Sequence, residues 1–242
     1  MESLIAILFC LAIQRFANVG SWFNVSWFEN YLKRLHPWLI GINEWLGIGL
    51  IIAPVIILLG ILNLLFHMHW FGLLNLILTI TVLFCCLDAR CSREHDSVKT
   101  ILQHSFARIF PILFWFIAFG DFGIHIVVAY FMLYLIQAKI SKVDAHCAGI
   151  KKASEQIKNA LDWVPSRLLG FSYALAGNFN KGFAYWRKNL WLGLSDNSEF
   201  AIGSGIASLD DSVDSAQALA LVDRVLVIWL IVIILVTIGS LL

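Results

Sequence analysis

The sequence is poor in charged residues and correspondingly rich in apolar ones. Of its 242 residues, 14% are charged and 60% are hydrophobic, and the mean hydropathy is +0.82. Soluble domains carry about 25% charged residues, so this composition excludes an ordinary water-soluble globular protein. The net charge of +1 gives no general attraction to nucleic acid, and no nucleic-acid partner is expected.

Disulfide, metal and nucleotide signatures are also missing. The five cysteines are odd in number and lie mostly in or beside apolar runs. Their spacing fits neither a disulfide framework nor a common zinc site, and we predict no metal site. No GxxxxGK[ST] loop occurs, so no ordinary nucleotide site and no cofactor are predicted. The N-terminus opens with Glu2 rather than a basic stretch, which is not typical of a secretory signal.

Long apolar segments are what the sequence does contain. Residues 47–87 predict a transmembrane hairpin, and residues 222–242 predict a C-terminal transmembrane helix, because one span needs about 20 apolar residues. Residues 106–138 form a longer membrane segment, broken at Gly120-Asp121-Phe122-Gly123. The predicted fold is an all-α polytopic integral membrane protein with about four transmembrane segments plus interfacial or re-entrant helices.

Two further segments predict helices at the membrane surface. Residues 1–45 mix aromatic and basic side chains, which is typical of amphipathic interfacial helices. Residues 139–221 are polar and also predict interfacial helices, the first opened by a capping box at Ser141-Lys142-Val143-Asp144. Together with the spans they predict a single membrane domain over residues 1–242.

The topology depends on how residues 106–138 cross the membrane. If they form one span, the polar segment 139–221 faces outward. If they enter and leave on the same side, the Lys/Arg-rich segments all lie on one side, and the positive-inside rule places them in the cytoplasm.

The polar segment contains an unusual run, Leu161 to Leu168, which reads LDWVPSRL. Pro165 is predicted to end one helix and to begin the next. Arg167 would then lie in a first helical turn, where free N–H groups and the helix dipole favour an anion. Asp162 would orient Arg167 or cap the helix. The alternative is a local Asp–Arg pair that fixes the turn and binds nothing.

Ionisable residues within apolar segments are further candidates. Asp121 and His125 are four positions apart, and an ionisable pair at membrane depth indicates a functional site. The alternative is that the chain meets water at Gly120-Asp121. Arg15, in the N-terminal apolar run, either snorkels to lipid headgroups or faces a ligand or carboxylate.

The LDWVPSRL run resembles the AmpE family of bacterial inner-membrane proteins. The resemblance also rests on Gly170, Tyr173-Ala174-Leu175, Gly177 and Trp186, and on Pro111 to Trp115 with Gly120, Gly123 and Tyr130. It implies a multi-pass signalling or regulatory protein of the bacterial cytoplasmic membrane, linked to β-lactamase induction and peptidoglycan recycling. The family's N-terminal Glu-Arg pair reads Gln14-Arg15 here, so only the arginine carries over.

AmpE proteins are in turn similar to the CobD/CbiB membrane enzymes of cobalamin biosynthesis, which join a carboxylate to an amine in an ATP-dependent step. Those enzymes share the motif around Asp162 and Arg167. Their Glu-Asn…Asp-Gly signature, however, reads Gln103 to Arg108, QHSFAR, in this sequence. The acids that would hold magnesium or bind an amine are missing, which argues against corrinoid amidation.

Three functional hypotheses follow. The first is a non-catalytic regulator in which an anionic small molecule or lipid headgroup meets a basic cytoplasmic face. The second is a divergent ligase or transferase acting on a phosphate-containing substrate with nucleotide and magnesium, with Asp121 or His104 in acid–base roles. The third is a platform for a membrane or cytoplasmic protein partner. Membrane lipids are expected contacts in all three. The candidate anion ligands are Arg167, Asp162, Arg15 and Arg108, with Gln14, His104, Asp121 and His125 as secondary candidates.

Overall fold

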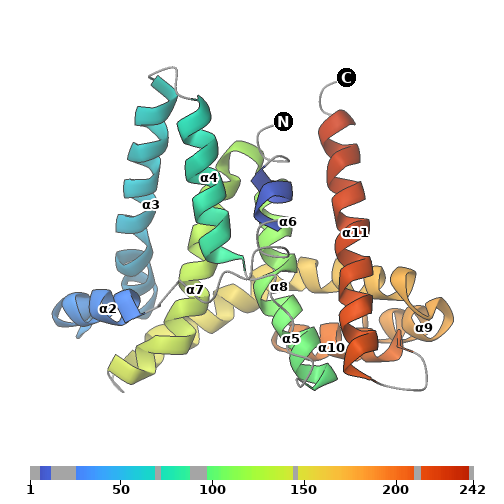
Figure 1. Ribbon diagram of the computed structural model, residues 1–242. Coiled ribbons are helices and arrows are strands. Elements are labelled where there is room, and N and C mark those ends of the chain that lie inside the picture. Colours follow the sequence, from blue (N-terminus) through green and yellow to red (C-terminus); the bar gives the residue numbers. More distant parts are fainter. Residues whose placement is uncertain are drawn as a thin grey trace.

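The computed structural model describes residues 6–11, 26–68, 72–87, 97–143, 147–209 and 214–239. Within these ranges every regular element is a helix, which confirms the all-α prediction (Figure 1). Residues 6–11 are helical. The following elements are α2 (Ser26–Leu39), α3 (Glu44–Met68), α4 (Gly72–Cys86), α5 (Val98–Arg108), α6 (Phe110–Ala118), η1 (Gly120–Phe122), α7 (Gly123–Val143), α8 (Ala148–Ala176), α9 (Phe179–Asn189), η3 (Leu194–Asp196), α10 (Asn197–Ala207) and α11 (Ser215–Gly239).

The helices form two layers. Helices α3, α4, α6 and α11 and the first part of α7 stand upright, whereas α2, α8 and α9 lie across their lower ends (Figure 1). Helices α5 and α10 and the end of α7 complete this lower layer, which we call the base. Four described segments are long and apolar enough to cross a membrane, namely 44–66, 98–118, 123–140 and 215–239. The prediction of about four transmembrane segments is therefore confirmed.

The predicted break in residues 106–138 is a hairpin. Helix α6 rises from the base, η1 turns the chain, and α7 returns to the base (Figure 1). Gly120 has φ of +51°, a backbone conformation that glycine adopts without steric cost. A Cβ on Gly123 would stand 2.2 Å from the Phe116 carbonyl oxygen. The two glycines thus permit the turn, and the hairpin places α8 on the same side as the start of α5.

Three helix boundaries differ from the prediction. Helix α7 continues to Val143, so residues 141–143 end a helix instead of opening one, and the predicted capping box is wrong. Helix α8 begins after Cys147, which makes no side-chain capping bond. Helix α11 begins at Ser215, before the predicted start of the last span at residue 222, because its first turns belong to the base. There Arg224 donates to the Ala176 carbonyl at 2.8 Å.

The buried core lies where α7 meets its neighbours. Helix α7 packs against α2, α3, α4, α6 and α8, and its apolar residues are mostly buried. Helix α8 in turn contacts α9, α10 and α11. The longest base helix, α8, therefore contacts the upright helices α3 and α11 on the two sides of the molecule, and it carries the LDWVPSRL run at its centre.

Candidate functional site

The LDWVPSRL run lies inside one uninterrupted helix. Helix α8 extends over 29 residues through Pro165, so the predicted helix junction is wrong. A proline inside a helix removes one backbone hydrogen bond and crowds the preceding turn, at a cost of about 3 kcal/mol. Pro165 is buried, and α8 packs against α3, α6, α7, α9, α10 and α11. These tertiary contacts hold the helix together through the proline.

The continuous helix also separates Asp162 from Arg167. Residues five positions apart point about 140° away from one another at roughly 100° per residue, so the two side chains leave different faces. Residues four positions apart share a face, and Lys158 accordingly forms an ion pair with Asp162, with Nζ 2.5 Å from Oδ2. The predicted role of Asp162 in orienting Arg167 is therefore wrong.

Asp162 belongs to a buried cluster with Lys158 and Tyr130. Tyr130 Oη on α7 donates to Asp162 Oδ1 at 2.7 Å, while Lys158 contacts the other carboxylate oxygen. The Lys158 ammonium also lies 5.2 Å from the centre of the Tyr130 ring, a cation–π contact. Asp162 is 2% exposed, so its charge is compensated inside the protein. We call these three residues the acid cluster.

Arg167 is directed toward the segment that connects α9 to α10. Its Nε donates to the Leu190 carbonyl at 3.2 Å and its Nη2 donates to the Leu192 carbonyl at 2.7 Å. Its Nη1 donates to Ser166 Oγ at 2.8 Å and to the Asn197 side-chain oxygen. The guanidinium thus fixes a turn of the chain through hydrogen bonds to neutral oxygens.

Aromatic rings close the remaining sides of the Arg167 guanidinium. Its carbon lies 4.5 Å from the centre of the Phe200 ring and 5.1 Å from that of Trp163. Trp186 Nε1 donates to the Arg167 carbonyl at 2.9 Å. Burial lowers the pKa of the Arg167 guanidinium, and the nearby Asp196 carboxylate opposes that change. Arginine stays charged over all ordinary pH values, so this is a permanent buried cation.

Asn197 completes the second cluster. Its Oδ1 accepts from Arg167 and, at 3.4 Å, from Ser166. Its Nδ2 donates to the carbonyls of Asn159 at 2.6 Å and Leu194 at 2.8 Å. Asn197 is 2% exposed, and its amide joins α8, η3 and α10. We call Arg167, Ser166 and Asn197 the arginine cluster.

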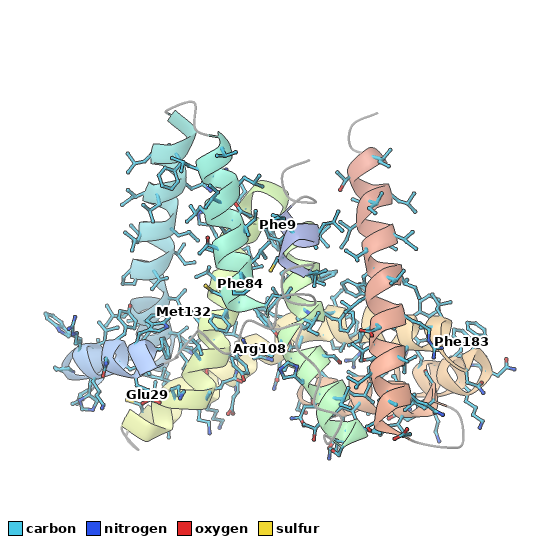
Figure 2. All side chains as sticks on the ribbon, in the orientation of Figure 1. Phe9, Glu29, Phe84, Arg108, Met132 and Phe183 are labelled. Carbon is cyan, nitrogen blue, oxygen red and sulfur yellow. The ribbon has the colours of Figure 1, made fainter. Side chains whose placement is uncertain are left out.

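Arg108 lies at the break between α5 and α6, close to the middle of the molecule (Figure 2). Its guanidinium carbon is 5.1 Å from the ring centres of both Phe131 and Tyr134 on α7. Its Nε is buried and has no hydrogen-bond partner among the described residues. Among the described residues Arg108 thus differs from Arg167, whose Nε, Nη1 and Nη2 all donate hydrogen bonds.

Of the other predicted site residues, only His104 and His125 have described side chains. Gln14 and Arg15 lie outside the described residues, as does the side chain of Asp121 in η1. His104 is on α5. His125 is near the start of α7, and its ring centre lies 6.4 Å from that of Phe122. Among the described residues, no three His, Cys, Asp or Glu side chains are grouped so as to hold a metal ion.

Sequence reasoning missed Tyr130, Lys158 and Asn197. The pairing of Lys158 with Asp162 could have been found from their spacing of four positions. Nothing local indicates Tyr130 or Asn197, which lie 32 and 30 positions from their partners Asp162 and Arg167. Both clusters thus depend on contacts that only the fold creates.

The part of the chain that matches a known protein family contains both clusters. The family model described as "Regulatory signalling modulator protein AmpE" matches residues 99–242. The cobalamin biosynthesis protein CobD of Stutzerimonas stutzeri is 27% identical over 131 residues, 51% of this chain and 42% of the relative. That of Chromobacterium violaceum is 24% identical over 132 residues, 52% of this chain and 41% of the relative. The chain therefore spans less than half the length of these curated relatives. No solved structure matches.

The fold and the two clusters define a multi-pass helical membrane protein whose upright helices stand on a base fixed by buried charges. The family match covers well over half of the chain, including all of α6 to α11. The protein belongs to the AmpE family of regulatory signalling modulators. The predicted resemblance to this family, and the more distant similarity to CobD, are both confirmed.

Proposed function

We propose that the protein is a regulatory signalling modulator of the bacterial inner membrane that acts in β-lactamase induction and peptidoglycan recycling without catalysing a reaction. The observation that carries this proposal concerns Asp162 and Arg167, the two residues of the motif that resembles CobD. Asp162 is engaged by Tyr130 and Lys158, and Arg167 by carbonyls and Asn197. Groups engaged in this way stabilise the base and are not free for proton transfer or phosphate binding.

We place the base in the cytoplasm. The hairpin of α6 and α7 returns the chain to the base, and exposed cations lie on the base helices α2, α8 and α9. They include Lys33 and Arg34 on α2, Lys152 on α8, and Arg187 and Lys188 on α9. Cytoplasmic segments of membrane proteins are enriched in such residues, and they favour contact with the anionic inner leaflet.

An anionic small molecule or lipid headgroup is the ligand class we propose for this side. Arg167 and Asp162 make internal contacts, so an anion would have to displace their partners. Arg108 is the better candidate, since its Nε has no partner among the described residues.

A divergent CobD-like ligase or transferase is the second candidate, favoured by the similarity to the two CobD proteins. The residues at the position of the CobD/CbiB acidic signature, Gln103 to Arg108, argue against this second candidate. Here Ser105 is buried and exchanges a hydrogen bond with Tyr173 Oη at 3.0 Å, and Phe106 is buried in the core. These residues pack α5 in place instead of presenting acids.

The test is β-lactamase induction in a bacterium that has an inducible enzyme and lacks its own gene of this family. Expression of the chain is expected to change the β-lactamase activity reached after addition of an inducing β-lactam, measured by hydrolysis of a chromogenic substrate. An immunoblot of the membrane fraction controls for protein level. Unchanged induction at normal protein level would contradict the regulatory role. ATP turnover by the purified chain with magnesium would favour the enzyme instead.

A further inference from the structure

An apolar groove opens between the upright helices α6 and α11, with α8 as its floor. Its volume is about 370 Å³, within the range of roughly 300–1,000 Å³ common for small-molecule sites. The walls are formed by residues such as Ala118 on α6 and Val232 on α11, and the floor by Phe171 and Leu175 on α8. Nearly all of the lining is hydrocarbon, so the groove is suited to an apolar occupant.

The one polar contact in the groove is already satisfied. Trp229 Nε1 on α11 donates to Ser172 Oγ on α8 at 3.0 Å, and Ser172 donates to the Leu168 carbonyl at 2.8 Å. This bond ties the upright wall to the floor without leaving a free donor inside the groove. An occupant would therefore make only apolar contacts there.

The groove lies between two candidate membrane spans. Both of its walls belong to segments that are apolar and long enough to span a membrane, and its floor is a helix of the base (Figure 1). With the base at the membrane surface, as proposed above, the floor lies near headgroup depth and the opening above it lies in the acyl region. A chain entering the groove would have its apolar part between α6 and α11 and its polar end beside the base.

Aromatic side chains of α9 border this end of the groove, and two exposed cations follow them in the chain. Phe171 on the floor lies 5.5 Å from Trp186 and 6.4 Å from Phe183, ring centre to ring centre. Phe183, labelled in Figure 2, projects from α9 at the end of the base beyond α11. Arg187 and Lys188 follow Trp186 directly and are exposed. Aromatic rings with adjacent cations are typical of the headgroup region.

The geometry points to an anionic phospholipid bound at this site, with one acyl chain in the groove and its phosphate beside Arg187 and Lys188. The apolar lining favours an acyl chain, and the two cations favour a headgroup that carries negative charge. The site shares no residue with the acid and arginine clusters. The inference rests on the proposed function only for the placement of the base at the membrane surface.

The chain arm of the test is native mass spectrometry of the delipidated full-length protein in detergent, titrated with phosphatidylglycerol or phosphatidylcholine. The variants Ala118→Trp and Val232→Trp fill the groove from opposite walls and are expected to weaken phosphatidylglycerol binding about tenfold, which corresponds to about 1.4 kcal/mol. Ala53→Trp is the matched control, because Ala53 is exposed on the distant span α3. It is expected to bind like the wild type.

The headgroup arm uses the Arg187→Ala/Lys188→Ala double variant. It is expected to reduce the preference for phosphatidylglycerol over phosphatidylcholine by about tenfold, because each surface cation near an anionic lipid contributes to binding. Lys33→Ala/Arg34→Ala on α2 removes two exposed cations away from the groove and is expected to keep the preference.

Equal lipid binding by both groove variants and the wild type would overturn the inference. It would also be overturned if the tryptophan variants changed the oligomeric state with lipid binding unaltered, since a second copy or partner helix would then occupy the groove. Failure of these binding measurements leaves β-lactamase induction unaffected, so it is distinguishable from failure of the proposed function.

Discussion

Helices α3 and α8 show two ways of stabilising a long helix in one molecule. In the spanning window of α3, 17% of the residues are buried, and most of its exposed side chains are large and apolar. Helix α8 instead buries Lys158, Asp162 and Arg167. Lipid can solvate a uniformly apolar helix, whereas a base helix with buried charges depends on particular partners.

The comparison assigns different roles to the two layers. An upright helix that mainly contacts lipid tolerates exchange among apolar residues, because lipid chains and leucine side chains are equally apolar. A buried charge is costly unless it is paired and hydrogen-bonded. Substitutions in the base should therefore have much larger effects than comparable ones in α3 or α11, and three predictions test that difference.

The largest effect is expected at Arg167. Replacing it by alanine removes hydrogen bonds to the carbonyls of Leu190 and Leu192 and to Asn197. A hydrogen bond to a charged group contributes about 1.5–3 kcal/mol, so the loss should reach at least about 4 kcal/mol. The measurement is unfolding of the purified protein in detergent.

Two variants sharpen the Arg167 result. Arg167→Lys keeps the charge but cannot reach the same oxygens with one planar group, so it should remain clearly destabilised. Arg34→Ala removes an exposed arginine of α2 and should change stability by less than about 0.5 kcal/mol. Similar effects of Arg167→Ala and Arg34→Ala would contradict the buried role of Arg167.

The next largest effect is expected in the acid cluster. Asp162→Ala leaves the Lys158 ammonium without its carboxylate in a site where Lys158 is 9% exposed. Breaking a buried pair by removing one partner costs about 3–5 kcal/mol, and a loss of about 3 kcal/mol is expected in the same unfolding measurement. A water molecule bound to the Lys158 ammonium would reduce this loss of stability.

A double substitution separates the pair from its burial. Lys158→Met/Asp162→Leu replaces both charges with apolar side chains, and such replacements are often neutral or stabilising. It should regain most of the stability lost in Asp162→Ala. If it is less stable than the single variant, the cluster contributes through Tyr130 or through shape instead of through compensation of charge.

Much of the upright layer could be predicted from sequence, because its signals are local. Apolar length alone indicated α3 and α11, and the glycines at 120 and 123 indicated the turn between α6 and α7. A glycine is needed where a Cβ would collide or where φ is positive, and both conditions are properties of a few neighbouring residues.

The base could be predicted only in part, because its determinants are distant in sequence. The proline rule predicted a helix end at Pro165, but contacts of α8 with six other α-helices outweigh the local cost. The predicted helix junction at Pro165 in turn led to the expected pairing of Asp162 with Arg167. The continuous helix turns these residues apart, and their true partners lie on α7, on α10 and in the segment between α9 and α10.

The smallest effect on stability is expected for glycine-to-alanine substitutions. One glycine from each layer gives the most direct comparison of the two layers. Gly177 separates α8 from α9, and a Cβ there would stand 2.2 Å from the Ser208 carbonyl oxygen. That oxygen accepts the Asn178 N–H at 2.8 Å, so it cannot move without loss of the bond. Gly177→Ala should therefore destabilise the protein by about 1–3 kcal/mol, the usual cost of overpacking.

Gly49 in α3 is the matched control for Gly177. A Cβ there meets nothing within 4 Å, and alanine in a helix interior is favoured over glycine by about 0.5–1 kcal/mol. Gly49→Ala should thus be neutral or slightly stabilising in the same unfolding measurement. Because the chemical change is identical, opposite signs at the two positions would show that the layers differ in packing. A comparable destabilisation by both would mean that α3 packs against protein at Gly49, and that the contrast between lipid-facing and base helices is weaker than the structure indicates.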